Sequence, residues 1–420
     1  MKRILLISLS LLIITSAHGQ AFKAGAAVRV ITPDPLLPVS GGVGTPNPVT
    51  EKKGDLFVRA MVFEKGDERI AIVGIDNLGW PAVLGDRSRE LILGIPPENI
   101  LIGVTHTHSA PDAYGFPDEN GNVGADLGYL EWCVQQIADA VNEAVDNLEP
   151  AILKTAVGEA RGKISYNYYA PELYDPRCGV MQAITAGGQN EGKPIATLVN
   201  YATHPEIIGS DRSILTPDLC GPLYDRIEEK VGGIAIFMNS AQGGMVTADN
   251  RRAHGEEAND WEECIRIGEL MADEALRIID EAEVQLNPDL YCTSRTIDFP
   301  VDSEMMRFIL NNSPLGLGTS ESNTISTSIN LLNIGSAQAI TIPGEALPNI
   351  GYYIKRHMPT EQAFLFGLTN DAFGYILTPE DFNSFKRYNY ISRTSLGEMT
   401  GEIYIKEVLK LIENSPKPGE

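Results

Sequence analysis

The chain has 420 residues, and 33 Lys and Arg against 56 Asp and Glu give a formal net charge of −23. With 43% hydrophobic and 21% charged residues, the composition is that of a globular protein and excludes disordered, collagen-like and multi-span membrane chains. A pI of about 4.7 argues against nucleic-acid binding, because such proteins need a basic surface to displace phosphate counterions. We therefore expect a substrate that is neutral, cationic or reached through a metal.

The N-terminus has the pattern of a secretory signal peptide. A basic start, Met1–Arg3, precedes the apolar run Ile4–Thr15 and the small-residue site Ala17–Gly19. An uncleaved anchor is the alternative, which the shortness of the apolar run disfavours. We predict that residues 1–19 are removed, that the protein is exported to the periplasm or secreted, and that residues 20–420 form one domain without a transmembrane segment.

Strand-like apolar runs alternate with helical patterns along the chain, which predicts an α/β fold. Amphipathic helices are expected over Leu127–Leu148, after a cap at Asp126, and over Asp260–Glu281. The predicted strands are Leu56–Phe63, Ile70–Ile75, Ile100–Val104, Ile152–Val157, Ile195–Tyr201, Gly233–Met238, Thr293–Phe299, Ala337–Ile342 and Ala363–Leu368. We expect mixed β-sheets flanked by helices in a single large layered domain, with the Ser/Gly/Asn-rich segment Asn311–Asn323 as a mobile excursion.

The five cysteines are few for an exported chain and odd in number, so at least one is unpaired or pairs between chains. They form no CxxC pair. Cys133 and Cys264 fall inside helical patterns, where cysteine is usually a small buried apolar residue.

Three of the six histidines follow apolar strand-like runs. His106 and His108 lie two apart on an extended segment, so their side chains point to one side. Neutral imidazole suits zinc, and such a pair supplies two ligands, or one ligand and one proton-transfer group. His204 follows another run; taken alone, it fits a structural hydrogen-bonding residue as well as a ligand.

Two further strand ends carry candidate side chains. Pro343-Gly344 breaks a strand and is followed by Glu345, and Tyr375 follows the turn after Gly367. Polar side chains from the ends of separate strands are how an α/β scaffold builds a site.

These motifs resemble those of the neutral/alkaline (non-lysosomal) ceramidase family. The resemblance is carried by Thr105–Pro111, Asn200–Pro205, Pro343–Glu345 and Gly367–Tyr375, in the family's order, and Val28–Pro33 is similar to the start of its catalytic N-terminal domain. It covers roughly Ala21 to Glu413. Because little sequence follows the helical pattern of 401–414, we expect the catalytic domain only, with no C-terminal immunoglobulin-like domain.

The resemblance implies the site. In that family one zinc ion per chain is held by two histidines, a glutamate and a tyrosine, which correspond here to His106, His204, Glu345 and Tyr375. His108 matches a catalytic histidine that faces the substrate, and either Tyr388 or Tyr390 matches a tyrosine that lines the site. The residues that correspond to a substrate-lining glycine turn are Asn239, Gln242, Gly243 and Gly244.

The implied function is hydrolysis of an N-acyl amide, ceramide or a related compound, by metal-activated water. Two departures leave the substrate open: Met245-Val246 stands where ceramidases carry a serine, and Asn167-Tyr168 where they carry Asn-Arg. One alternative is a zinc-dependent carbohydrate-active or ester-cleaving enzyme on an exported glycan, with tyrosines such as Tyr166 and Tyr168 stacking on sugars. The other is a metal-binding protein without activity, because Gly244 replaces a usual acid.

Overall fold

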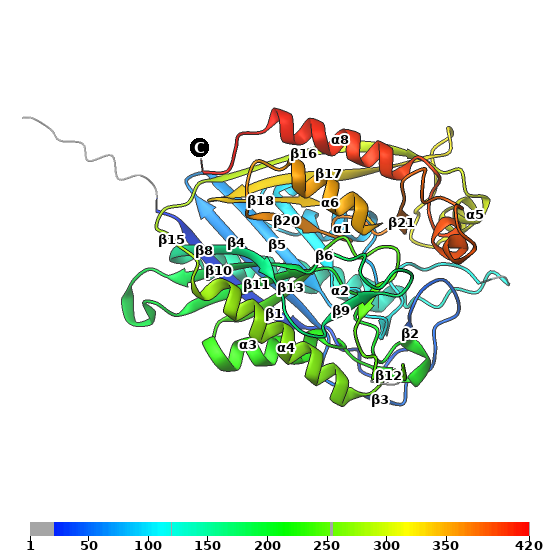
Figure 1. The fold of residues 1–420 in the computed structure, drawn as a ribbon, viewed down its shortest axis with the longest axis horizontal. Helices are drawn as coiled ribbons and strands as arrows, with labels where there is room; N and C mark the ends of the chain where they lie inside the picture. The colour runs from blue at the N-terminus through cyan, green and yellow to red at the C-terminus, as the bar shows by residue number, and fades with distance from the viewer. Residues whose placement is uncertain (1–20, 119, 253–254, 420) are drawn as a thin grey trace, which may run out of the picture.

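Two β-sheets pack face to face at the centre of the molecule, and helices cover the outer face of each (Figure 1). The structure, a computed structural model, describes residues 21–118, 120–252 and 255–419. The predicted signal peptide lies outside these ranges, so its assignment remains a prediction.

The larger sheet holds most of the predicted strands. Its order is β13 (Ile234–Asn239), β11 (Pro194–Tyr201), β10 (Arg177–Thr185), β8 (Glu149–Glu159), β1 (Lys23–Val30), β4 (Phe57–Lys65), β5 (Glu68–Ile75) and β6 (Ile100–Val104), with β15 (Val284–Gln285) beside β8. The pairs β11/β13 and β5/β6 are parallel and the others antiparallel. The sheet is therefore mixed, as expected.

The smaller sheet has the order β16 (Leu290–Pro300), β17 (Thr324–Ile334), β18 (Ala337–Thr341) and β20 (Ala363–Phe366). Side chains alternate between the two faces of each strand. On β4, Met61 and Phe63 pack toward this smaller sheet, whereas Val58, Ala60 and Val62 pack beneath α2 (Leu127–Asp146). This alternation explains why β4 is buried on both of its faces.

The helices divide between the two outer faces. The larger sheet is covered by α2 together with α1 (Ala82–Glu90), α3 (Cys220–Val231) and α4 (Trp261–Asp280). The smaller sheet is covered by α5 (Glu304–Asn312), α6 (Pro348–His357) and α8 (Thr400–Asn414), and α7 (Asn389–Arg393) is a short helix. The Asp126 side chain accepts a hydrogen bond from the Tyr129 N–H, which confirms the predicted cap of α2.

Short strand pairs tie the loops together at one edge of the layers. They are β2 (Val39–Ser40) with β7 (Ala110–Pro111), β3 (Glu51–Lys52) with β12 (Ile214–Leu215), β9 (Ser165–Asn167) with β14 (Val246–Ala248), and β19 (Glu345–Ala346) with β21 (Tyr375–Ile376). The candidate histidines, Glu345 and Tyr375 all lie on or beside these loops.

The nine predicted strands and both predicted long helices are present. Within Asn311–Asn323, Leu315 is buried in the core beneath α2, and the Asn311 side chain accepts a hydrogen bond from the Thr319 N–H; the mobility expected of this segment remains a prediction. All five cysteines are free, and Cys133 and Cys264 are buried as expected. In the described ranges, the helices are too short or too polar to cross a membrane.

One buried ion pair joins α6 to the start of β10. Lys355 Nζ lies 2.9 Å from Asp175 Oδ2, and both side chains are almost fully buried. Arg177 also binds this carboxylate through two hydrogen bonds. Burial opposes ionisation of Asp175, but Lys355 and Arg177 outweigh burial and hold its pKa below the usual value.

We expect Lys355→Met to lower the free energy of unfolding by about 3 kcal/mol at neutral pH, because it leaves a buried carboxylate short of a partner. A carboxyl whose pKa is lowered on folding stabilises the protein above its unfolded pKa, and this stabilisation is lost as pH falls through the folded pKa. Urea unfolding from pH 7 downward should therefore show the difference between variant and wild type shrinking below about pH 4. Lys410→Met, which removes a more exposed ion pair with Glu407, is the control; an equal loss at every pH would contradict the assignment.

Candidate metal centre

His106 follows β6 and has a backbone conformation that non-glycine residues rarely adopt. Its φ is 70°, its backbone N–H donates to Asn77 O, and its Nδ1 lies 2.5 Å from Leu78 O. Left-handed backbone costs about 1–2 kcal/mol in a residue with a Cβ and is typical of functional sites. With Nδ1–H donating to the Leu78 carbonyl, Nε2 carries the free lone pair.

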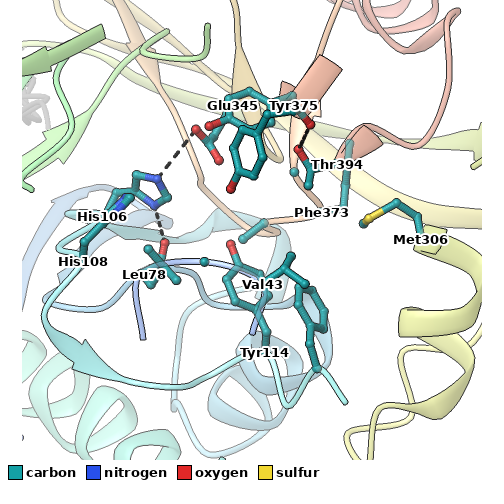
Figure 2. Close-up of a pocket in the computed structure, with 16 residues that line it drawn as sticks. Val43, Leu78, His106, His108, Tyr114, Met306, Glu345, Phe373, Tyr375 and Thr394 are labelled. Carbon is teal, nitrogen blue, oxygen red and sulfur yellow. Dashed lines mark hydrogen bonds and ion pairs between the residues drawn. The ribbon is translucent and has the colours of Figure 1, made fainter. Parts of the chain in front are cut away.

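His204 is held in the same way from the end of β11. Its backbone N–H donates to Val246 O over 2.9 Å, and its Nδ1 lies 2.7 Å from the same oxygen. Its Nε2 lies 3.1 Å from Glu345 Oε2. His106 Nε2 lies 3.7 Å from the same oxygen (Figure 2). The structure thus brings His106, His204 and Glu345 together as the sequence predicts.

His108 completes a group of three histidines. The imidazole centroids lie 4.8 to 5.5 Å apart, and one nitrogen from each ring lies within 4.8 Å of the others, so the group could hold a metal ion. His108 differs in its partners: its Nδ1 lies 3.4 Å from Glu206 Oε2, and its Nε2 is buried without a hydrogen-bond partner among the described residues.

Burial and charge set the protonation of this group. Burial lowers the pKa of His106 and of His108 to about 3, so both imidazoles are neutral. Burial also opposes the charge of His204, but the hydrogen bond to Glu345 and the charge of Glu206 raise its pKa to about 9. The histidines in turn outweigh burial and lower the pKa of Glu345. A metal cation would replace the proton between His204 and Glu345.

Asn239, at the end of β13, links the two histidine loops. Its Nδ2 donates to Thr105 O at 3.0 Å and to Thr203 O at 2.7 Å, the carbonyls that precede His106 and His204. The side chain is fully buried. Asn239 therefore fixes the spacing of the two loops, and a role in lining the substrate remains a prediction.

The other residues of the predicted glycine turn lie behind Glu345. Gln242 is fully buried, and a Cβ on Gly243 would overlap the Glu345 backbone. Gly244 has a φ of 69°, which favours glycine. Gly243 and Gly244 therefore allow the close approach of this turn to Glu345 and Leu347, and their contact with a substrate remains a prediction.

A pocket of about 490 Å³ opens beside the centre, with His106, His108, Glu345, Tyr375 and Tyr390 in its wall. Tyr375 donates its hydroxyl hydrogen toward Met245 Sδ over 3.6 Å, and its ring lies 6.0 Å from that of Tyr390. Tyr388, the other candidate, packs instead against Tyr169 and Phe385.

Sequence reasoning missed several residues of the site. The Leu78 carbonyl could not be found, because any residue type supplies one. Glu206 could have been found from the sequence, because it is a charged residue that directly follows His204-Pro205 in a loop predicted to form the site. The Gly41-Gly42 pair in the sequence also indicates a place where the backbone passes close to another group. In the structure, a Cβ on Gly41 would lie 3.5 Å from His108 Nδ1. The apolar wall of the pocket, including Tyr114 and Phe116, comes from a loop without such a signal.

The donor set fits a transition-metal ion. Two imidazole Nε2 atoms face one carboxylate oxygen, and both Nδ1 atoms bond to backbone carbonyls, which is the usual support for histidine ligands. The fold and site define a mixed α/β protein with a buried histidine and carboxylate centre at its strand ends.

The chain has the fold of neutral ceramidase. Neutral ceramidase from Pseudomonas aeruginosa superposes with a TM-score of 0.77 and 18% identity, over 96% of this chain and 76% of that one. A structure described as ceramidase complexed with C2 gives a TM-score of 0.73 with the same identity and coverage. No protein-family model and no curated protein matches the sequence.

We expect Asn239→Asp to weaken metal binding by about 10–100-fold, because a carboxylate cannot donate to the Thr105 and Thr203 carbonyls that set the two loops. Titration with zinc, followed by calorimetry on the full chain, measures this affinity. Asn333→Asp is the matched control, since Asn333 Nδ2 donates to Pro416 O, away from the histidines. Unchanged zinc affinity in Asn239→Asp would contradict the linking role.

Proposed function

We propose that the protein is an exported zinc-dependent hydrolase that cleaves an N-acyl amide. The observation that carries the proposal is the convergence of His106 Nε2 and His204 Nε2 on Glu345 Oε2, in the wall of a largely apolar pocket. The ceramidase fold supports the same reaction class, and export rests on the sequence of residues 1–19.

His106, His204, Glu345 and Tyr375 are the proposed zinc ligands. Bound zinc supplies Lewis acidity toward the amide carbonyl and toward water. The Leu78 and Val246 carbonyls accept from the Nδ1 atoms of the two imidazoles, so both Nε2 atoms would be free to bind zinc once the cation replaces the proton between His204 and Glu345. Burial favours this role, because a low-dielectric site strengthens the interaction between cation and carboxylate.

His108 and Tyr390 are the proposed proton-transfer and oxyanion-stabilising groups. His108 Nε2 lacks a partner among the described residues and is therefore available to move a proton to the leaving amine. Burial raises the pKa of Tyr390 to about 12, so its hydroxyl stays protonated and donates a hydrogen bond to a developing oxyanion.

The apolar wall favours an acyl group as the part of the substrate that enters the pocket. Its apolar lining includes Leu78, Tyr114, Met306 and Phe373 (Figure 2). Phe116 belongs to the same lining. These side chains stabilise an alkyl chain by about 25 cal/mol per Å² of apolar surface removed from water. Ceramide and other N-acyl compounds share this feature. A polar cleft beside His108 is what favours the glycan-directed alternative.

The first test combines metal analysis with hydrolysis of N-acyl sphingosines and other N-acyl amines. We expect about one zinc per chain in the wild type, and loss of both zinc and fatty-acid release in His106→Ala. His357→Ala, an exposed histidine on α6, is the control and should keep both. Absence of zinc from the wild type would overturn the proposal; zinc without hydrolysis of any amide would leave a metal site and overturn the amidase.

A second prediction separates the two candidate tyrosines. Tyr390→Phe removes the hydroxyl beside the centre and should lower kcat by about 100-fold with little change in KM. Tyr388→Phe, whose ring lies in the outer aromatic group, should keep wild-type kcat. The reverse result in steady-state kinetics would assign the role to Tyr388.

A further inference from the structure

A second cleft, of about 1040 Å³, meets the candidate centre at His108 and differs in chemistry from the apolar pocket. Its wall is polar: side chains from the loop after His204 and from the β14 region bring carboxylates, amides and hydroxyls together. They include Glu206, Ser210, Asp211, Thr247, Asn250 and Glu257.

His108 lies in the walls of both cavities. The two cavities are also in contact through Tyr375, in the wall of the apolar pocket, whose hydroxyl lies 3.6 Å from Met245 Sδ in the wall of the polar cleft. A bond broken beside His108 therefore has an apolar cavity on one side and a polar cavity on the other.

The polar cleft carries an excess of negative charge. Arg212, its cationic side chain, lies 3.0 Å from Asp211 Oδ1 and is neutralised there. Glu206 faces His108, and within the described ranges neither Glu206 nor Glu257 forms an ion pair with a lysine or arginine. Such carboxylates accept hydrogen bonds from hydroxyl or ammonium groups and repel anions.

An exposed aromatic ring stands in the same wall. Tyr168 is 60% exposed, and its ring meets that of Tyr169 at a centroid distance of 5.9 Å and an interplanar angle of 63°. Tyr166, its neighbour in the cleft, has the Arg251 guanidinium 3.6 Å from its ring centroid, so one face of that ring is covered. A flat aromatic face beside hydrogen-bond acceptors suits a ring that has both apolar faces and hydroxyl edges.

We propose that this cleft binds the amine half of the substrate as a hydroxyl-rich amine of the amino-sugar kind, with the sugar ring on Tyr168 and hydroxyl groups directed to Glu257. The inference rests on the proposed amidase function. Hydrolysis adds water across the amide: the C–N bond breaks, the acyl group in the apolar pocket leaves as a carboxylate, and the amine in the polar cleft leaves as a free amino sugar.

The test keeps the acyl group constant and changes the amine. N-hexanoyl-glucosamine, N-hexanoyl-dodecylamine and N-hexanoyl-glycine are given to the zinc-loaded full chain, and released hexanoate gives kcat/KM for each. We expect the glucosamine amide to exceed the glycine amide by about tenfold or more, because the glycine carboxylate would face Glu206 and Glu257. The highest kcat/KM for the dodecyl amide would overturn the proposal in favour of a long-chain amine.

Two variants assign the effect to the cleft. Tyr168→Ala should raise KM for the glucosamine amide about tenfold and leave kcat unchanged, whereas Tyr353→Ala, a tyrosine on α6 outside both cavities, should change neither. Glu257→Lys should lower the ratio of kcat/KM for the glucosamine amide to kcat/KM for the glycine amide. An unchanged ratio in Glu257→Lys together with an unchanged KM in Tyr168→Ala would overturn the proposal.

Direct binding separates this inference from the proposed function. Calorimetric titration of the protein with glucosamine measures occupancy of the cleft without turnover. Binding that Tyr168→Ala weakens, with hydrolysis of no amide, would refute the amidase and retain the sugar-binding cleft. Hydrolysis of other amides without binding of glucosamine would retain the amidase and refute the cleft proposal.

Discussion

The Asn239 side chain sets the distance between the two loops on which the candidate centre depends. Its single amide nitrogen donates to the carbonyls that precede His106 and His204, although these residues end strands in different parts of the larger sheet. Loss of one of these acceptors would leave a buried N–H without a partner, at a cost of about 1–3 kcal/mol in stability. The Asn239 side chain therefore holds the two loops together in addition to their packing. Each imidazole is then aimed by its own carbonyl, from Leu78 or Val246.

Glu345 reaches this pair from the other sheet. The β18 strand ends in the smaller sheet, and the turn after it lets the backbone of Glu345 approach Gly243 closely. The centre therefore forms only when the two sheets are packed face to face, and the apolar residues between them, such as Phe63 and Phe364, position it as much as its own hydrogen bonds do. A left-handed His106 is tolerated in this setting because its own N–H, the N–H of Thr105 and its ring are all hydrogen-bonded.

Sequence patterns predict the elements that are apolar along their length and the polar residues that follow them. They miss β1, β10 and β17, the last because Thr324, Ser326 and Ser328 interrupt the apolar pattern on one face of the strand. They also miss the layers, since face-to-face packing of two sheets depends on pairings between distant strands that no local pattern records. Within the site, His106, His204 and Glu345 are predictable from strand ends, whereas the choice between Tyr388 and Tyr390 depends on which side of the short helix α7 and the turn before it faces the pocket.

The fold alone does not determine the substrate, because the candidate centre and the two cavities beside it are built from different parts of the chain. The strand ends supply the residues that fit a metal, and these are fixed by two sheets and a buried amide. The two cavities beside His108 are built mainly from loops, which vary without disturbing the sheets. One cavity is walled by Tyr114, Phe116 and Phe373, and the other carries Glu206 and Glu257. The proposed substrate, with one apolar and one hydroxyl-rich half, matches both cavities, whereas a molecule that is apolar at both ends would place an alkyl chain against the carboxylates of Glu206 and Glu257.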